Sequence, residues 1–248
     1  MSYQDIISSV DASLARLQTD YIDLLQIHWP DRYVPLFGDT AYDLSKERDY
    51  IPFEEQLRAF EYLHKEGKVR CFGVSNETPY GVMKFSQLAT LGGFPAIVSI
   101  QNSYSLINRA DFESSLTEVC SPRHENIGLL AYSPLAGGIL TGKYANSDCP
   151  GARLNLFQGY MERYKQSLAQ EAVKEYSNLA QQYELTPAQL ALIWCYSQPH
   201  VASTIIGATT LSQLNENIEA YDMLDKYTDE IREGISKIYK RYRDPSKI

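Results

Sequence analysis

The sequence predicts an α/β fold, an incomplete (β/α)8 TIM barrel with five parallel strands, because short apolar runs alternate with longer segments of helical period. Strand–helix–strand order implies right-handed crossovers and a parallel sheet. The chain has 248 residues, a length at which single barrels are common. We therefore expect a single domain over residues 1–248.

Five apolar runs bounded by turn or polar residues are typical of buried strands. They span residues 21–28, 70–75, 96–101, 128–133 and 204–207. A closed parallel barrel needs eight strands, so five strands predict an open arc that exposes the face meant for the barrel interior. An exposed apolar face of this kind predicts aggregation or self-association through the open barrel.

Helical period predicts one helix before the first strand, further helices between strands and two at the end of the chain. They span residues 3–17, 54–66, 80–91, 110–119, 163–183, 187–197, 211–221 and 228–242. Two long connections, residues 31–52 and 142–161, break this rhythm. Connections of this length are often functional, so both are candidates for covering a substrate or cofactor.

Composition and charge argue against several kinds of partner and binding site. A net charge of −8 and a pI near 5.1 disfavour nucleic acid as a partner. The four cysteines, Cys71, Cys120, Cys149 and Cys195, are far apart, which indicates neither a zinc site nor a disulfide framework and favours reduced thiols in the cytoplasm. No apolar run reaches the roughly 18 residues of a membrane span, so no membrane partner is expected; a targeting segment ahead of Met1 stays open.

Residues 16–30, RLQTDYIDLLQIHWP, put His28 at the carboxyl end of a buried strand, where barrel enzymes carry catalytic groups. There an imidazole could donate a hydrogen bond to a substrate carbonyl, although a lone histidine in a sheet is more often structural. The segment closely resembles the signature of the aldo-keto reductase family. In that family a histidine orients the carbonyl, a nicotinamide cofactor delivers hydride, and a tyrosine assisted by a lysine and an aspartate from earlier strands donates the proton. The resemblance transfers only the catalytic histidine, as His28.

The resemblance continues in order along essentially the whole chain. Gly73-Val74-Ser75-Asn76 is similar to the family segment whose Ser-Asn pair binds the nicotinamide carboxamide, and Gln101 resembles the third polar contact. By itself the tetrapeptide is equally typical of a turn that caps a helix.

Residues 131–138, AYSPLAGG, resemble the strand and loop where an aromatic ring stacks on nicotinamide and backbone amides meet the pyrophosphate, although an aromatic at a strand end usually only fills the core. Residues 137–143 also fit GxxxxGK, but Tyr144 replaces the Ser/Thr that would hold Mg²⁺, which disfavours a P-loop ATPase. The resemblance instead implies that Lys143 and Arg153 contact cofactor phosphates. Within residues 131–138, the cofactor contacts that the resemblance implies are Tyr132, Ser133, Pro134, Leu135 and Gly137.

Residues 206–217 run from the last strand into a helix whose N-terminus suits a phosphate. One face of this helix could bind the adenosine end of a dinucleotide, because Gln213, Glu216 and Asn217 have the spacing i, i+3, i+4. Gly207 and Thr209, which precede the helix, are further candidate cofactor contacts. The alternative is a solvated helix with a threonine cap. Some relatives carry a lysine and an arginine where this chain has Gly207 and Gln213, so NADP(H) preference depends on Lys143 and Arg153. The chain has no GxGxxG, so a Rossmann site is not expected.

Three hypotheses follow. The first is an NADP(H)-dependent oxidoreductase that interconverts carbonyls and alcohols on a small-molecule substrate. The second is a catalytically impaired or inactive form, acting at most as a nucleotide-binding or regulatory module, because the family's tyrosine, lysine and aspartate are lacking and general acid catalysis contributes about 10²–10⁴-fold. The third is a protein with an upstream segment of roughly one hundred residues that supplies three βα units.

Overall fold

The structure is a computed structural model that describes residues 1–35, 39–144, 153–157, 161–165 and 167–247. The side chains of Arg153 and Ser167 are not described. Most of the second long connection, including Cys149, therefore lies outside the described residues, and so does the predicted phosphate contact of Arg153.

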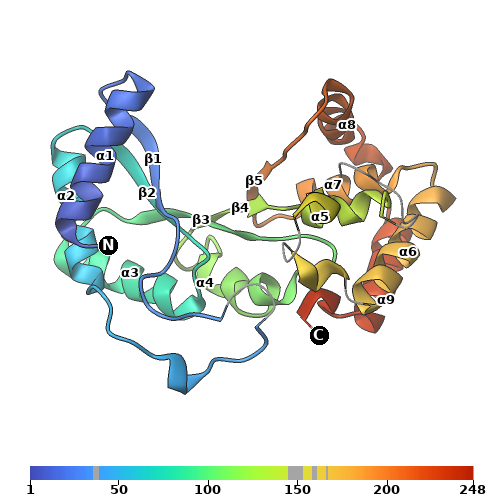
Figure 1. Ribbon diagram of the computed structural model, residues 1–248, viewed down its shortest axis with the longest axis horizontal. Helices are drawn as coiled ribbons and strands as arrows, with labels where there is room; N and C mark the ends of the chain where they lie inside the picture. The colour runs from blue at the N-terminus through green and yellow to red at the C-terminus, as the bar shows by residue number, and fades with distance from the viewer. Residues whose placement is uncertain (36–38, 145–152, 158–160, 166, 248) are drawn as a thin grey trace. The chain divides into compact units, whose positions relative to one another are not determined.

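Five parallel strands form one sheet in the order β1-β2-β3-β4-β5, accompanied by helices (Figure 1). In the register of the first three strands, Ile27 pairs with Val74 and Ser75 pairs with Gln101, so their carboxyl ends are level. This confirms the predicted α/β fold class and is consistent with part of a (β/α)8 barrel. The strands are β1 (Ile22–Ile27), β2 (Val69–Ser75), β3 (Ile97–Ser103), β4 (Gly128–Tyr132) and β5 (Val201–Ile205).

The helices begin at residues whose chemistry favours a helix start. Ser2 and Thr186 form capping boxes with Asp5 and Gln189, and Pro187 occupies the first turn of its helix. The α-helices are α1 (Tyr3–Leu17), α2 (Phe53–Lys65), α3 (Pro79–Gly92), α4 (Thr117–Cys120), α5 (Arg153–Leu156), α6 (Ser167–Gln182), α7 (Pro187–Tyr196), α8 (Leu211–Asp222) and α9 (Asp229–Arg241). Short 3₁₀ segments span Leu44–Lys46, Ala136–Thr141, Glu162–Lys165, Leu224–Lys226 and Pro245–Lys247.

Three predicted elements differ from the structure. The helix predicted over residues 163–183 corresponds to a 3₁₀ segment, Glu162–Lys165, and α6 (Ser167–Gln182). The last strand was expected over residues 204–207 but spans Val201–Ile205, because the chain becomes extended directly after the turn at Pro199 and His200. Gly207 therefore follows the strand instead of ending it. The helix predicted over residues 110–119 contains a π-helical stretch, Phe112–Leu116, before α4.

The chain forms two compact units, and the first comprises Met1–Pro35, Ala41–Asn102 and Ser115–Leu129. Its core lies where α2 and α3 pack beside β2. Phe60 stacks on Phe72 with ring centroids 4.2 Å apart, and Phe53 meets Phe85 edge to face at 4.7 Å. Each buried phenylalanine contributes about 1.5–3 kcal/mol by burial. Phe60 and Phe72 thus anchor α2 to β2, and Phe53 and Phe85 anchor α2 to α3.

The second unit comprises Leu36–Thr40, Ser103–Ser114 and Leu130–Ile248. The buried Trp194 of α7 stacks on Tyr104 at 4.9 Å. Near the end of the chain the buried Asp244 carboxylate accepts hydrogen bonds from the backbone amides of Arg109 and Ala110, each at 2.9 Å. This contact ties the C-terminal segment to the start of the helical stretch before α4. The single domain expected over residues 1–248 stays a prediction.

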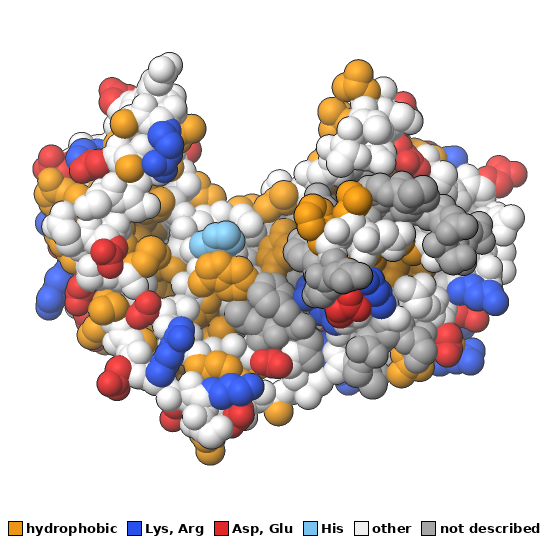
Figure 2. Space-filling view, viewed as in Figure 1, with side chains coloured by type: hydrophobic (Ala, Val, Ile, Leu, Met, Phe, Trp, Pro, Cys, Tyr) orange, Lys and Arg blue, Asp and Glu red, His pale blue; other side chains and the backbone are white. Residues whose placement is uncertain are grey.

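One face of α8 is apolar and exposed. Leu211, Leu214, Ile218 and Tyr221 all project from it, and Figure 2 shows hydrophobic side chains gathered over this helix. Exposed apolar stripes favour association. The predicted self-association through the open barrel is a separate expectation and stays a prediction. Among the described residues, no helix combines the length and apolar composition needed to cross a bilayer.

Candidate functional site

His28 lies directly after β1, with its side chain exposed. Its backbone carbonyl accepts a hydrogen bond of 2.9 Å from Asn76 Nδ2. The imidazole stacks on Trp29, with ring centroids 5.1 Å apart and planes inclined by 21°. Within the part of the chain that the structure describes, the imidazole makes no hydrogen bond, so both ring nitrogens are available to a ligand.

Ser75 and Asn76, at the end of β2, meet Gln101 of β3. Ser75 Oγ donates to the Gln101 carbonyl at 2.7 Å, and the backbone amide of Asn76 donates to the same oxygen at 3.0 Å. Asn76 Nδ2 also donates to Ser75 Oγ at 3.1 Å. Asn76 has φ +55°, a left-handed conformation that asparagine tolerates better than most residues. The three predicted carboxamide contacts are therefore brought together with the His28 backbone.

Gln26 of β1 extends this group, which we call the amide cluster: Gln26, Ser75, Asn76 and Gln101. Gln101 Nε2 donates to Gln26 Oε1 at 2.8 Å. Room for Gln26 comes from Gly73, its register partner, where an added Cβ would lie 3.3 Å from Gln26 Cγ and 2.2 Å from Ser99 Oγ. Sequence reasoning missed Gln26, although its position two residues before His28 on the same strand was a usable signal.

The amide cluster has the donors and acceptors that a carboxamide ligand requires. Gln101 is half-buried, and its side-chain oxygen and second amide hydrogen have no partner among the described residues. An amide side chain can accept at its oxygen and donate at its nitrogen, which complements the C=O and NH₂ of a primary carboxamide. The residues present thus fit the ligand group that the sequence resemblance implies.

The loop after β4 contains left-handed residues. Gly137 and Gly138 have φ +68° and +94°, values at which a side chain would be strained. A Cβ on Gly138 would lie 2.9 Å from Lys143 Nζ, so the ammonium group is beside this backbone. Turns of this kind can expose successive amides to an anion, and the lysine adds a positive charge. Of the other residues predicted here, Tyr132, Ser133 and Leu135 are half-buried and Pro134 is buried.

The residues predicted around α8 are engaged within the second unit. Gln213 Oε1 accepts from the backbone amide of Thr209 at 2.9 Å, and Glu216 Oε1 accepts from Thr186 Oγ1 at 2.7 Å. Asn217 is buried and its side-chain amide donates to the Gly207 carbonyl at 3.4 Å. Gly207, Thr209 and Gln213 are exposed, whereas Glu216 is half-buried. Binding by the Gln213, Glu216 and Asn217 side chains stays a prediction.

Three tyrosines, Tyr33, Tyr104 and Tyr144, carry phenols that bear on the question of a proton donor. Tyr104 belongs to the second unit, and its hydroxyl donates to Glu113 Oε1 at 2.6 Å; burial, together with the neighbouring Glu113 carboxylate, raises the pKa of Tyr104 well above its ordinary value. Tyr144 accepts from the Leu154 amide at 3.3 Å. The Tyr33 hydroxyl is buried and has no hydrogen-bond partner within the described ranges. Tyr104 is thus held in a structural contact.

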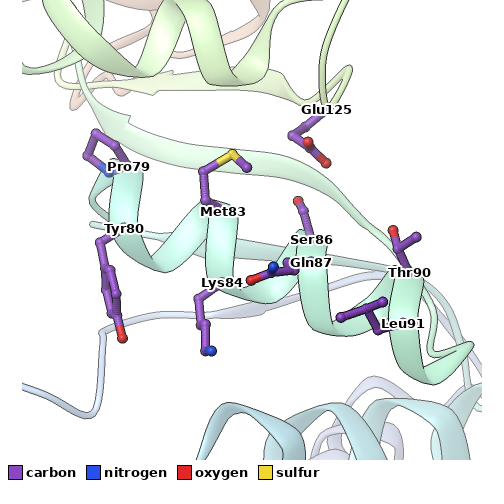
Figure 3. Close-up of a pocket in the computed structure, with 9 residues that line it drawn as sticks. All are labelled: Pro79, Tyr80, Met83, Lys84, Ser86, Gln87, Thr90, Leu91 and Glu125. Carbon is purple, nitrogen blue, oxygen red and sulfur yellow. The ribbon is translucent and has the colours of Figure 1, made fainter.

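A groove of about 660 Å³ lies on α3, away from the predicted residues. Figure 3 shows Met83, Ser86 and Thr90 on the side where Glu125 lies, whereas Tyr80 and Lys84 project to the other side. None of the residues predicted to bind substrate or cofactor lines this groove. It therefore contributes nothing to the carboxamide assignment.

Comparison with known proteins agrees with the geometry. Residues 1–240 match the model of the aldo/keto reductase family. The chain is 43% identical to an aldo-keto reductase of Babesia bovis over all of this chain and 90% of that protein, and 42% identical to protein tas of Escherichia coli over 98% of this chain and 69% of that protein. It is 32% identical to a putative voltage-gated potassium channel subunit beta of Schizosaccharomyces pombe, over 96% of this chain and 65% of that protein. These matches support a nicotinamide-dependent oxidoreductase. The chain belongs to the aldo/keto reductase family.

Proposed function

We propose that the protein is an NADP(H)-dependent oxidoreductase that interconverts a small-molecule carbonyl compound and its alcohol. The observation that carries this proposal is the amide cluster, whose Ser75, Asn76 and Gln101 are hydrogen-bonded to one another and to the His28 backbone. Family membership adds to it. Because the free thiols Cys71, Cys120 and Cys195 suit a reducing compartment, the proposal includes a cytoplasmic location.

The amide cluster would hold the carboxamide of the nicotinamide, with Gln101 as acceptor and donor. The bound cofactor supplies or accepts the hydride. His28, whose imidazole is exposed and whose backbone carbonyl accepts from Asn76 of the cluster, would donate a hydrogen bond to the substrate carbonyl and stabilise negative charge developing on its oxygen. This role requires an imidazole N–H directed at the ligand.

Preference for NADP(H) over NAD(H) is assigned to Lys143, together with Arg153. Lys143 Nζ lies beside the left-handed Gly138 backbone, where a phosphate would meet a positive charge. Tyr132, Ser133, Pro134, Leu135 and Gly137 supply the surrounding loop, and the exposed Gly207 and Thr209 stand at the start of α8.

We also propose a second candidate function, which one observation favours. The Tyr104 hydroxyl donates to Glu113 and burial raises its pKa, so this phenol is not free to protonate an alkoxide. A protein that binds NADP(H) without turnover would act as a nucleotide-binding or regulatory module. The channel-subunit name of the Schizosaccharomyces pombe relative is compatible with such a role.

The deciding experiment measures NADPH oxidation with a reactive aldehyde and, in parallel, NADPH binding by fluorescence titration. Turnover that His28→Ala abolishes, with binding retained, supports the oxidoreductase. Binding without turnover in the unaltered chain supports the module. Absence of binding contradicts both. His124→Ala is the matched control, since His124 is an exposed histidine remote in sequence from the amide cluster.

A further inference from the structure

We propose that Arg32 and Glu77 are a positioning pair that fixes the turn carrying Asn76 and so aligns the amide cluster with His28. The inference rests on the proposed function, in which that cluster holds the nicotinamide carboxamide. Both residues belong to the first compact unit. Neither belongs to the set of ligand contacts that the sequence predicts.

The two side chains form a buried, bidentate ion pair. Arg32 Nη1 donates to Glu77 Oε1 at 2.8 Å, and Arg32 Nη2 donates to Glu77 Oε2 at 2.7 Å. Only 10% of the arginine side chain and 2% of the glutamate side chain are exposed. A fork-to-fork pair restrains the orientation of both groups as well as their separation. The Glu77 side chain therefore has little freedom.

Glu77 follows Asn76 directly and is held from three directions. Its carboxylate accepts the Thr78 backbone amide at 2.8 Å, at the start of α3. Its own backbone amide donates to Asn102 Oδ1 at 3.2 Å, and its carbonyl accepts from Asn102 Nδ2 at 3.0 Å. A left-handed residue such as Asn76 persists when its surroundings determine it. Glu77 contributes to those surroundings beside the bonds that Asn76 makes to His28, Ser75 and Gln101.

Arg32 is held equally firmly, four residues after His28. Its guanidinium carbon lies 5.4 Å from the ring centroids of both Phe53 and Tyr80. Tyr80 projects from the first turn of α3 to the side opposite Glu125 (Figure 3). The segment after β1 and the turn after β2 are thus joined twice, by the ion pair and by the bond from Asn76 to the His28 carbonyl.

Stability alone does not account for such a pair. Burying two charges costs desolvation, and well-packed neutral replacements of buried ion pairs are often as stable as the original. A purely structural pair could therefore be replaced with no effect on ligand binding. A positioning pair predicts the opposite: a neutral replacement folds but holds the Asn76 turn less firmly.

The central variant is the double replacement Arg32→Met with Glu77→Gln, which removes both charges together. Thermal unfolding checks that it folds. Hydrogen exchange at the Asn76 backbone amide, which bonds to Gln101, reports on the turn without any cofactor, and NADPH titration reports on its consequence. The matched control is Arg70→Met with Asp23→Asn, an exposed ion pair of 2.7 Å on β1 and β2 of the same unit.

The expected result is an unchanged unfolding midpoint, faster exchange at Asn76, and NADPH affinity reduced about threefold to tenfold, the effect of one lost neutral hydrogen bond. The control pair should change neither exchange nor affinity. Unchanged exchange, or faster exchange with unchanged NADPH affinity, overturns the proposal. If the unaltered chain does not bind NADPH, the proposed function fails, and exchange at Asn76 alone decides whether the pair fixes the turn.

Gly81→Ala provides a second test if the double variant fails to fold. An added Cβ would lie 2.0 Å from Glu77 Oε2, so this change displaces the carboxylate without altering either charge. It should accelerate exchange at Asn76 as the double variant does. Arg32→Lys keeps the charge but loses the fork, and should give an intermediate exchange rate. Wild-type exchange in both variants would overturn the positioning role.

Discussion

The side-chain amide of Asn76 donates a 2.9 Å hydrogen bond to the backbone carbonyl of His28. This bond joins the carboxyl ends of β1 and β2 through a buried side chain. Asn76→Asp keeps the shape of the residue but removes the donor and sets a carboxylate against a carbonyl oxygen. We expect a loss of about 1–3 kcal/mol in the free energy of unfolding, measured with urea. A change of only a few tenths of a kcal/mol would show that this bond does not hold the strand ends together.

Position 73 requires a glycine because Ser99 of the neighbouring strand approaches it closely. A Cβ at this position would lie 2.2 Å from Ser99 Oγ and 2.9 Å from the Ser99 carbonyl. Gly73→Ala should therefore destabilise the protein by about 1–3 kcal/mol, the range for overpacking, and Ser99→Ala should relieve part of this cost. Gly207→Ala is the control, because nothing lies within 4 Å of a Cβ there. Equal unfolding midpoints for the two alanine variants would refute the packing argument.

His200 gives stability a pH dependence near neutrality. Burial lowers the pKa of this imidazole, which stacks on Phe112 at 5.1 Å. The unfolded chain takes up the proton near the ordinary value of about 6.5, whereas the folded chain takes it up only at lower pH. Stability is thus fully retained above about pH 6.5 and falls as the pH drops below it, by at most about 1.4 kcal/mol per pH unit.

Replacement of His200 isolates this effect. Urea unfolding between about pH 8 and about pH 5.5 brackets the ordinary histidine pKa. His200→Leu should flatten the dependence of unfolding free energy on pH, because the leucine has no proton to bind. His124→Gln removes an exposed imidazole and should leave the slope as in the unaltered protein. An unchanged slope in His200→Leu would assign the dependence to other groups.

Lys143 should distinguish the phosphorylated cofactor. Its ammonium group lies beside Gly138, so Lys143→Met should weaken NADPH binding more than NADH binding, and added salt should narrow the difference between the variant and the unaltered protein. Lys84→Met, on α3 in the other unit, is the control. The measurement is a pair of fluorescence titrations at two salt concentrations. Equal losses for both cofactors would remove Lys143 from the basis of NADP preference.

The sequence was most informative where local pattern and chemistry coincide. The apolar run before His28 and the Ser75-Asn76 pair after the next strand predicted residues that the structure brings into contact. Parallel topology explains this success, since carboxyl ends of adjacent strands lie at one edge of a sheet. The end of the last strand was less predictable, because both Val201–Ile205 and the residues after it are rich in β-branched and small residues.

Long-range polar partners could not be read from the chain. Arg32 and Glu77 are 45 residues apart, and each is typical of a solvated loop when taken alone. Glu216 likewise fits an exposed helix face, yet it accepts from Thr186, 30 residues away. Side-chain pairs of this kind depend on how turns and helices that are distant in the sequence come together in the fold, which hydrophobic period does not specify.

Calorimetric titration of the unaltered chain with NADPH tests whether the amide cluster holds the nicotinamide carboxamide. Gln101→Leu removes the half-buried amide of the cluster, while Gln87→Leu removes an exposed amide on α3 of the same unit. We expect saturable binding that Gln101→Leu weakens by about threefold or more and Gln87→Leu leaves unchanged. Absence of binding in the unaltered chain, or equal affinity in Gln101→Leu, would contradict it.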